Sequence, residues 1–220
     1  MSQSPEPYVP ALKFRRLTAL YDPLLRWTMR ETTFKEQLVR QAAIAPGQRV
    51  LDLGSGTGTL VLLVKRSCPE AEVVGLDGDE AVLDLAREKA ARSRVKVAFD
   101  HGLSFDLPYA DASFDRVLSS LLFHHLTRDQ KERTLREALR VLRPEGEIHV
   151  ADWGPAPNPL LRAAFLLVQL LDGFDTTQDN VAGRLPKLFL AAGFVDVVRT
   201  AHVTTPFGVL ELLRGRNPAS

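Results

Sequence analysis

The sequence predicts an α/β protein, and three observations lead to this class. Between residues 50 and 152, short apolar runs typical of buried strands alternate with stretches of helical spacing. Turn-forming residues separate these runs, as in APGQ at 45–48. Near the end of the chain, two extended runs flank TPFG at 205–208, which favours an antiparallel hairpin. Repeated βα units build a parallel sheet covered on both faces, so we expect a Rossmann-like, doubly wound sheet of seven mostly parallel strands.

Each expected element has a local reason. Residues 1–10 contain three prolines and are expected to be loose, whereas 11–45 have apolar residues at helical spacing and predict a helical cover. Asp79 and Thr127 are placed to cap helices, Gly193 to end one, and RPEG at 143–146 to form a turn. The expected strands are 50–53, 73–76, 95–99, 113–120, 147–151, 194–204 and 208–214. The expected helices are 58–67, 79–93, 127–142, 160–174 and 185–192.

The composition limits the function classes. With 220 residues and no repeats, the chain fits a single domain, divided into the cover, a ligand-binding core at 46–152, a variable insertion at 153–184, and a C-terminal helix and hairpin at 185–215. There are 28 basic and 27 acidic residues, so no electrostatic feature points to nucleic acid. The single cysteine, Cys68, excludes an intrachain disulfide and a cysteine metal cluster.

Targeting signals are not recognised in the sequence. The N-terminal segment MSQSPEPYVPALKFRR lacks the basic start and apolar core of a signal peptide. No uninterrupted apolar stretch reaches the roughly 18–20 residues of a membrane span. We therefore expect no integral membrane segment and a cytoplasmic location.

The segment RVLDLGSGTGTL at 49–60 is the strongest functional signal. Gly54, Gly56 and Gly58 follow the first expected strand, where ligands bind in open α/β sheets and where glycine lets a ligand pack on the backbone. Their spacing is G-x-G-x-G, which differs from the G-x-G-x-x-G of dinucleotide sites. Asp77 ends the second strand about twenty residues later, and its carboxylate can accept hydrogen bonds from a ribose diol. Together these features predict a nucleoside-containing ligand with an unphosphorylated ribose.

Four segments resemble the class I S-adenosylmethionine-dependent methyltransferases. They are VLDLGSGTG (50–58), VVGLD (73–77), LPYADASFDRVLSSLLFHHL (107–126) and LREALRVLRPEGEIHVAD (135–152). Within this superfamily the chain looks closest to the branch of ubiquinone and menaquinone C-methyltransferases, which YDPLLRWTMRE (21–31) also fits. The resemblance implies S-adenosylmethionine as the cofactor and a small-molecule methyl acceptor, with an apolar, quinol- or lipid-like acceptor as the narrower expectation.

The resemblance also assigns residues. It places the methionine part of the cofactor along the glycine loop, the ribose on Asp77 and the adenine near Gly78. The family often has an acid for the adenine amino group after the third strand. Here Leu103 stands at that position, so the backbone amides of Gly102 and Leu103 are the candidates. The complete expected cofactor set is Gly54, Ser55, Gly56, Thr57, Gly58, Asp77, Gly78, Gly102, Leu103, Ser119 and Ser120.

Methyl transfer from a sulfonium releases a neutral thioether, so alignment can supply much of the catalysis. A base is needed only when the acceptor must lose a proton. The candidates are His124 and His125 after the fourth strand, Asp152 after the fifth, and Tyr21. The histidines could instead orient a loop and pack under the sheet edge, and Asp152 could cap the segment WGPAP. Because the histidines are scattered along the sequence, we expect no metal site.

Several alternatives remain at this point. The chain could be a non-catalytic module that binds S-adenosylmethionine or S-adenosylhomocysteine, or an NAD-dependent oxidoreductase, which the glycine spacing disfavours. The apolar stretch LLRAAFLLVQLL at 160–171 is a buried helix or lid, a wall for an apolar acceptor, or a dimer contact. Either a monomer or a homodimer is compatible with the sequence.

Overall fold

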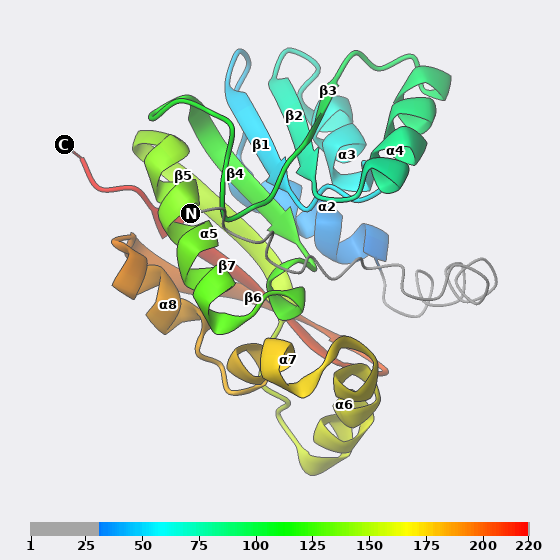
Figure 1. Ribbon diagram of the computed structural model, residues 1–220, viewed down its shortest axis with the longest axis vertical. Coiled ribbons are helices and arrows are strands. Elements are labelled where there is room, and N and C mark those ends of the chain that lie inside the picture. The colour runs from blue at the N-terminus through cyan, green and yellow to red at the C-terminus, as the bar shows by residue number, and fades with distance from the viewer. Residues whose placement is uncertain (1–30, 220) are drawn as a thin grey trace, which may run out of the picture.

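The computed structural model describes residues 31–219, which form one seven-stranded sheet (Figure 1). The strand order is β3-β2-β1-β4-β5-β7-β6, and β7 alone runs antiparallel to its neighbours. The predicted fold class is confirmed. The strands are β1 (Arg49–Leu53), β2 (Glu72–Asp77), β3 (Ala98–His101), β4 (Phe114–Ser120), β5 (Leu142–Trp153), β6 (Val195–Thr205) and β7 (Gly208–Arg216).

Helices cover both faces of the sheet. α2, α3 and α4 contribute to one apolar cluster, and α5 and α8 contribute to another on the opposite face. α6 and α7 lie together beyond the ends of β4 and β5 (Figure 1). The helices are α2 (Glu31–Ala42), α3 (Thr59–Ser67), α4 (Glu80–Arg92), the 3-10 helix η1 (Phe123–His125), α5 (Arg128–Val141), α6 (Pro159–Asp172), α7 (Phe174–Val181) and α8 (Leu185–Ala192). Among residues 31–219, no helix combines the length and apolar character needed to cross a membrane.

Local capping agrees with the sequence. Asp79 accepts hydrogen bonds from two amides of α4, and Thr127 forms a capping box with Gln130 at the start of α5. Gly193 ends α8 in the left-handed conformation. The predictions for residues 1–30, including Tyr21 and most of the helical cover, fall outside the described residues.

Three sequence expectations were wrong in detail. β5 begins at Leu142 instead of residue 147, but residues 143–146 interrupt its pairing with β4: Glu145 has a φ of +65°, the register jumps from Leu142 to Glu147, and Asn217 exchanges backbone hydrogen bonds with Glu145 and Gly146. The third strand begins at Ala98 instead of residue 95, because the amide of Val95 still bonds the end of α4. Residues 174–181 form α7, a helix that the sequence analysis did not predict.

The two edges of the sheet are irregular or short. β3 has four residues, and β6 shows register shifts against β7 between Val195 and Val198 and between Arg199 and Ala201. Such features interrupt the regular row of backbone groups that an edge strand presents.

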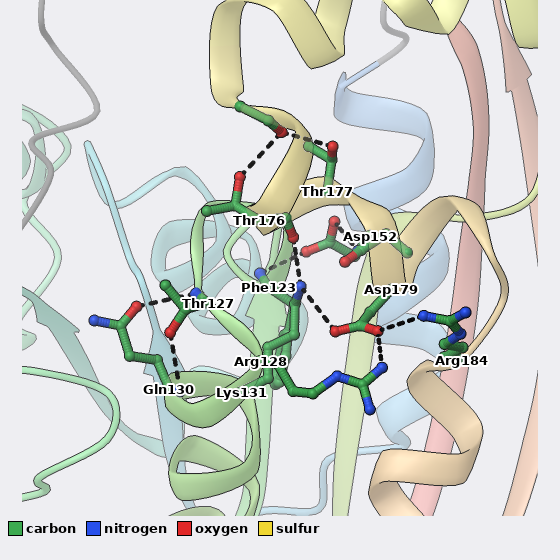
Figure 2. A network of polar contacts seen from close by, with 12 residues as sticks. Phe123, Thr127, Arg128, Gln130, Lys131, Asp152, Thr176, Thr177, Asp179 and Arg184 are labelled. Carbon is green, nitrogen blue, oxygen red and sulfur yellow. Dashed lines mark hydrogen bonds and ion pairs between the residues drawn. The ribbon is translucent and has the colours of Figure 1, made fainter.

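A buried charged network fixes α7 against α5 (Figure 2). The fully buried ammonium of Lys131 donates to the carbonyl oxygen of Thr176 and lies 3.8 Å from a carboxylate oxygen of Asp179. Asp179 also pairs with Arg128 and Arg184. Burial lowers the pKa of Lys131, and the charge of Asp179 opposes that shift. Because a buried charge needs a partner, this network determines where α7 lies.

Asp179→Asn should destabilise the protein by about 3–5 kcal/mol, since it removes the countercharge of a buried ammonium. Chemical denaturation measures this free energy of unfolding. The double variant Lys131→Met/Asp179→Asn should recover much of the loss, because no buried charge remains. If the double variant were as unstable as the sum of both single variants, charge pairing would not be what holds α7.

Candidate functional site

The glycine loop, residues 54–58, joins β1 to α3 at the carboxyl edge of the sheet. The amides of Gly54 and Ser55 both donate to the carbonyl oxygen of Leu76, at 2.9 and 3.0 Å, and so tie the loop to β2. The loop's three glycines have φ values of +68°, +52° and +72°, a region that other residues seldom adopt. Ser55 and Thr57 lie between them.

The three glycines serve different purposes. A Cβ atom on Gly54 would lie 2.9 Å from Leu122, and one on Gly58 would lie 2.8 Å from Phe99. Both glycines are therefore required by packing within the protein. A Cβ atom on Gly56 would meet nothing within 4 Å in the described structure. Gly56 is thus the position where the loop's backbone is open to a ligand.

Asp77, at the end of β2, faces this loop. One of its carboxylate oxygens accepts the amide of Gly56 at 2.8 Å, and the other accepts the amide of Asp79 at 3.0 Å. Burial raises the pKa of Asp77, although these two amides oppose the shift. Each oxygen keeps a lone pair, so the carboxylate can order the loop and still accept hydrogen bonds from a diol.

Asp52 is a polar group that the sequence analysis missed, whereas its neighbour in this site, Ser55, belongs to the predicted cofactor set. Both carboxylate oxygens of Asp52, 1% exposed in β1, and the hydroxyl of Ser55 have no hydrogen-bond partner among residues 31–219. Burial raises the pKa of Asp52 to about 7, although the nearby charge of Lys35 acts in the opposite direction. An acid within an otherwise apolar buried strand was the available sequence signal. A buried carboxylate without a partner suits a ligand that brings positive charge.

The other predicted cofactor residues are arranged as follows. The amide of Gly102 already donates to the carbonyl oxygen of Asp77, so it is not available to an adenine ring. Leu103 bridges to Asp106, and the carbonyl of Gly78 accepts a hydrogen bond from the ring of His101. At the end of β4, two buried serines, Ser119 and Ser120, lie next to β1, and the hydroxyl of Ser119 donates to the carbonyl of Leu53.

Asp152 organises the segment that follows β4. Its carboxylate accepts the backbone amides of Phe123 (2.7 Å; Figure 2) and Trp153 (2.7 Å) and the side-chain amide of Asn180 (3.0 Å). It also lies 2.8 Å from Nδ1 of His124. With 1% exposure and four donors, Asp152 is occupied by the protein itself. It therefore orients η1 and His124 and does not face a substrate.

His124, His125 and Asp172 come together from two elements. The two imidazole centroids are 4.0 Å apart, and Nε2 of His124 lies 3.7 Å from a carboxylate oxygen of Asp172. Burial alone would lower the pKa of His124, but Asp152 and Asp172 outweigh it and hold that pKa above its ordinary value. Burial, with the charge of His124, lowers the pKa of His125 to about 3. The sequence analysis singled out both histidines but not Asp172, because α6 is distant in sequence.

This cluster adjoins the glycine loop. Leu122, which precedes η1, is the residue that packs on Gly54, and the amide of Leu121 donates to the carbonyl of Ala151 at the end of β5. Both contacts place η1 at the same edge of the sheet as the loop. The histidines are thus positioned at the carboxyl edge, as the sequence predicted for residues following the fourth strand.

The helix α6 beside this cluster is apolar and largely uncovered. Within the described chain, only Phe165 and Gln169 of α6 are buried, and Phe165 packs against Trp153 with ring centroids 5.2 Å apart. The opposite face exposes large side chains, among them Leu160, Leu166, Leu167, Leu170 and Leu171.

Comparisons with known proteins agree with this geometry. A model of the family described as "Methyltransferase domain" matches residues 50–146. The demethylmenaquinone methyltransferase of Clavibacter sepedonicus is 32% identical over 207 residues, covering 84% of this chain and 81% of that protein. The protein of the same name from Deinococcus radiodurans is 37% identical over 120 residues. That match covers 54% of this chain and about half, 49%, of the relative's length.

A solved structure shows the same fold. The S-adenosylmethionine-dependent methyltransferase SibL superposes with a TM-score of 0.71 at 24% identity. The superposition covers 96% of this chain and 60% of that chain.

Gly56→Ala should weaken binding of S-adenosylmethionine at least about tenfold while lowering stability by only about 1–2 kcal/mol, the cost of a left-handed alanine. Isothermal titration calorimetry and thermal unfolding measure the two effects. Gly58→Ala is the matched control, because its methyl group would meet Phe99 and the larger effect should be on stability. Unchanged cofactor affinity in Gly56→Ala would contradict the assignment of open backbone at this position.

Asp52→Asn should weaken cofactor binding. At pH 8 it should nevertheless stabilise the free protein by roughly 1–3 kcal/mol, because the variant no longer buries a carboxylate charge that has no hydrogen-bond partner within residues 31–219. The folded pKa of about 7 lies above the unfolded value. The stability that Asp52 contributes is therefore present in acid and is lost as pH rises to about 7. Denaturation between pH 5 and 8 measures this difference. If the stability of Asp52→Asn relative to the wild type did not grow with pH, the carboxylate of Asp52 would have a hydrogen-bond or charge partner in the free protein.

Proposed function

Because the chain belongs to the S-adenosylmethionine-dependent methyltransferases, we propose that it transfers a methyl group to an apolar, quinol- or lipid-like small molecule. The observation that carries the proposal is the buried carboxylate of Asp52, which has no hydrogen-bond partner among residues 31–219 and lies in the strand that leads into the loop left open at Gly56. Two relatives named demethylmenaquinone methyltransferase support the narrower acceptor class.

The residues of the loop fit this cofactor. Asp52 would compensate positive charge of the bound group, and the open backbone at Gly56 would contact it. Asp77 would accept hydrogen bonds from the ribose hydroxyls through its remaining lone pairs. Bound S-adenosylmethionine supplies an electrophilic methyl carbon whose leaving group is a neutral thioether. The protein's own task is therefore to align the acceptor and exclude water.

The acceptor side is formed by η1 and α6. His124 and His125 supply the polar groups, and Asp152 is a positioning residue that holds the ring of His124. Where the acceptor must lose a proton, His124 is the stronger candidate proton acceptor, because its pKa lies above the ordinary value whereas that of His125 is about 3. The exposed leucines of α6, on the face opposite Phe165, add an apolar surface to this end of the molecule, which favours an apolar acceptor over a charged metabolite.

We expect the purified full chain to transfer labelled methyl groups from S-adenosylmethionine to a demethylated quinol in detergent, and not to small polar metabolites. Asp77→Ala should weaken cofactor affinity by about 1.5–3 kcal/mol, typical of lost hydrogen bonds to a charged group. Thermal unfolding of the variant separates this loss from a loosened loop.

The controls distinguish the alternatives. Cofactor binding without turnover on either acceptor class would favour a non-catalytic binding module. Tighter binding of NAD than of S-adenosylmethionine would overturn the proposal. Turnover on polar metabolites alone would retain the reaction and reject the apolar acceptor.

A further inference from the structure

Three potential metal ligands converge at the carboxyl edge of the sheet. His124 and His125 come from η1, and Asp172 is the last residue of α6. One donor atom from each residue lies within 4.8 Å of the other two. Ligands of a tetrahedral ion stand about 3.4 Å apart for bonds of about 2.1 Å, so a contraction of at most about 1.4 Å would close the set.

Asp152 prepares His124 for coordination. Its carboxylate lies 2.8 Å from Nδ1, so that nitrogen carries the proton and donates it. When the ring gives up its second proton, the lone pair lies on Nε2, the nitrogen 3.7 Å from Asp172 and too far from it for a hydrogen bond. Metal-binding histidines commonly donate their second nitrogen to a carboxylate in this way, which fixes the tautomer and ring orientation.

The surroundings also favour a cation. Asp172 ends a helix of 14 residues, where the backbone carbonyls carry partial negative charge. The side chain of Asp172 is 26% exposed, whereas that of His124 is 5% exposed, so the cluster is reached from the side of α6. A buried imidazole, a second imidazole and a partly accessible carboxylate therefore form a cluster of donors that solvent reaches at Asp172.

We propose that His124, His125 and Asp172 bind a divalent transition-metal ion, with Asp152 as the carboxylate that orients His124. Two imidazoles and one carboxylate suit zinc or iron(II) better than magnesium or calcium, which prefer oxygen ligands. Three protein ligands leave at least one coordination position for an exogenous oxygen. The sequence predicted no metal site, because it separates Asp172 from the histidines by 47 positions.

A metal ion at this site would activate the methyl acceptor, an inference that rests on the proposed function. An acceptor hydroxyl bound at the open position would have its pKa lowered and release its proton to solvent. The resulting anionic acceptor would be held beside the glycine loop, since Leu122 links η1 to Gly54. A free imidazole base would then be unnecessary.

Titration of the tag-free full chain, first treated with chelator, with Zn²⁺ should show one tight equivalent by calorimetry. Co²⁺ as a spectroscopic probe should give visible bands of a low-coordinate site. Asp172→Ala and His125→Ala should each weaken binding about tenfold or more. Asp172→Ala is the variant least expected to unfold the protein, because the side chain of Asp172 is partly exposed and contacts His124 at 3.7 Å. His202→Ala, in β6, is the matched control and should bind like the wild type.

The metal measurement is made without cofactor or acceptor, so it stands apart from the proposed reaction. Millimolar or weaker affinity in the wild type would overturn the site. Tight binding that survives both Asp172→Ala and His125→Ala would also overturn it, because the ion would then lie elsewhere. Tight binding at the cluster with no quinol turnover would keep the metal site and reject the acceptor class.

Discussion

The candidate acceptor side depends on one buried carboxylate, that of Asp152. Its oxygens accept hydrogen bonds from two backbone amides, from a side-chain amide of α7 and from the imidazole of His124. Trp153 belongs to β5, Phe123 and His124 belong to η1, and Asn180 belongs to α7, so three elements meet at this carboxylate. Because a buried carboxylate is stable only when its hydrogen bonds are satisfied, Asp152 specifies how η1 and α7 meet the sheet.

Asp52 presents the opposite case with the same side chain. Both aspartates are 1% exposed, yet Asp152 is surrounded by donors and Asp52 has none within the described chain. Burial raises the pKa of Asp152, but the charge and hydrogen bond of His124 and the amide of Trp153 outweigh this effect. The pKa of Asp152 therefore lies below its ordinary value. For Asp52 desolvation prevails. The contrast separates a carboxylate that builds the fold from one that lowers stability and that, under the proposed function, is available to the ligand.

The sequence predicted what local patterns encode. Strand and helix order, two helix caps and the glycine loop follow from short-range spacing, and the structure agrees with them. It did not reveal that Gly54 and Gly58 are required by Leu122 and Phe99, because both contacts cross between elements. The position of Asp172 and the extension of β5 through RPEG likewise depend on partners distant in the chain.

The irregular edges of the sheet limit how copies of the protein can associate. A four-residue β3 offers few backbone groups, and the register shifts in β6 break the straight row that a foreign strand would need. Extension of the sheet from one molecule into another is therefore disfavoured at both sides. Self-association through surfaces other than these two edges would depend on side-chain contacts instead of backbone hydrogen bonds.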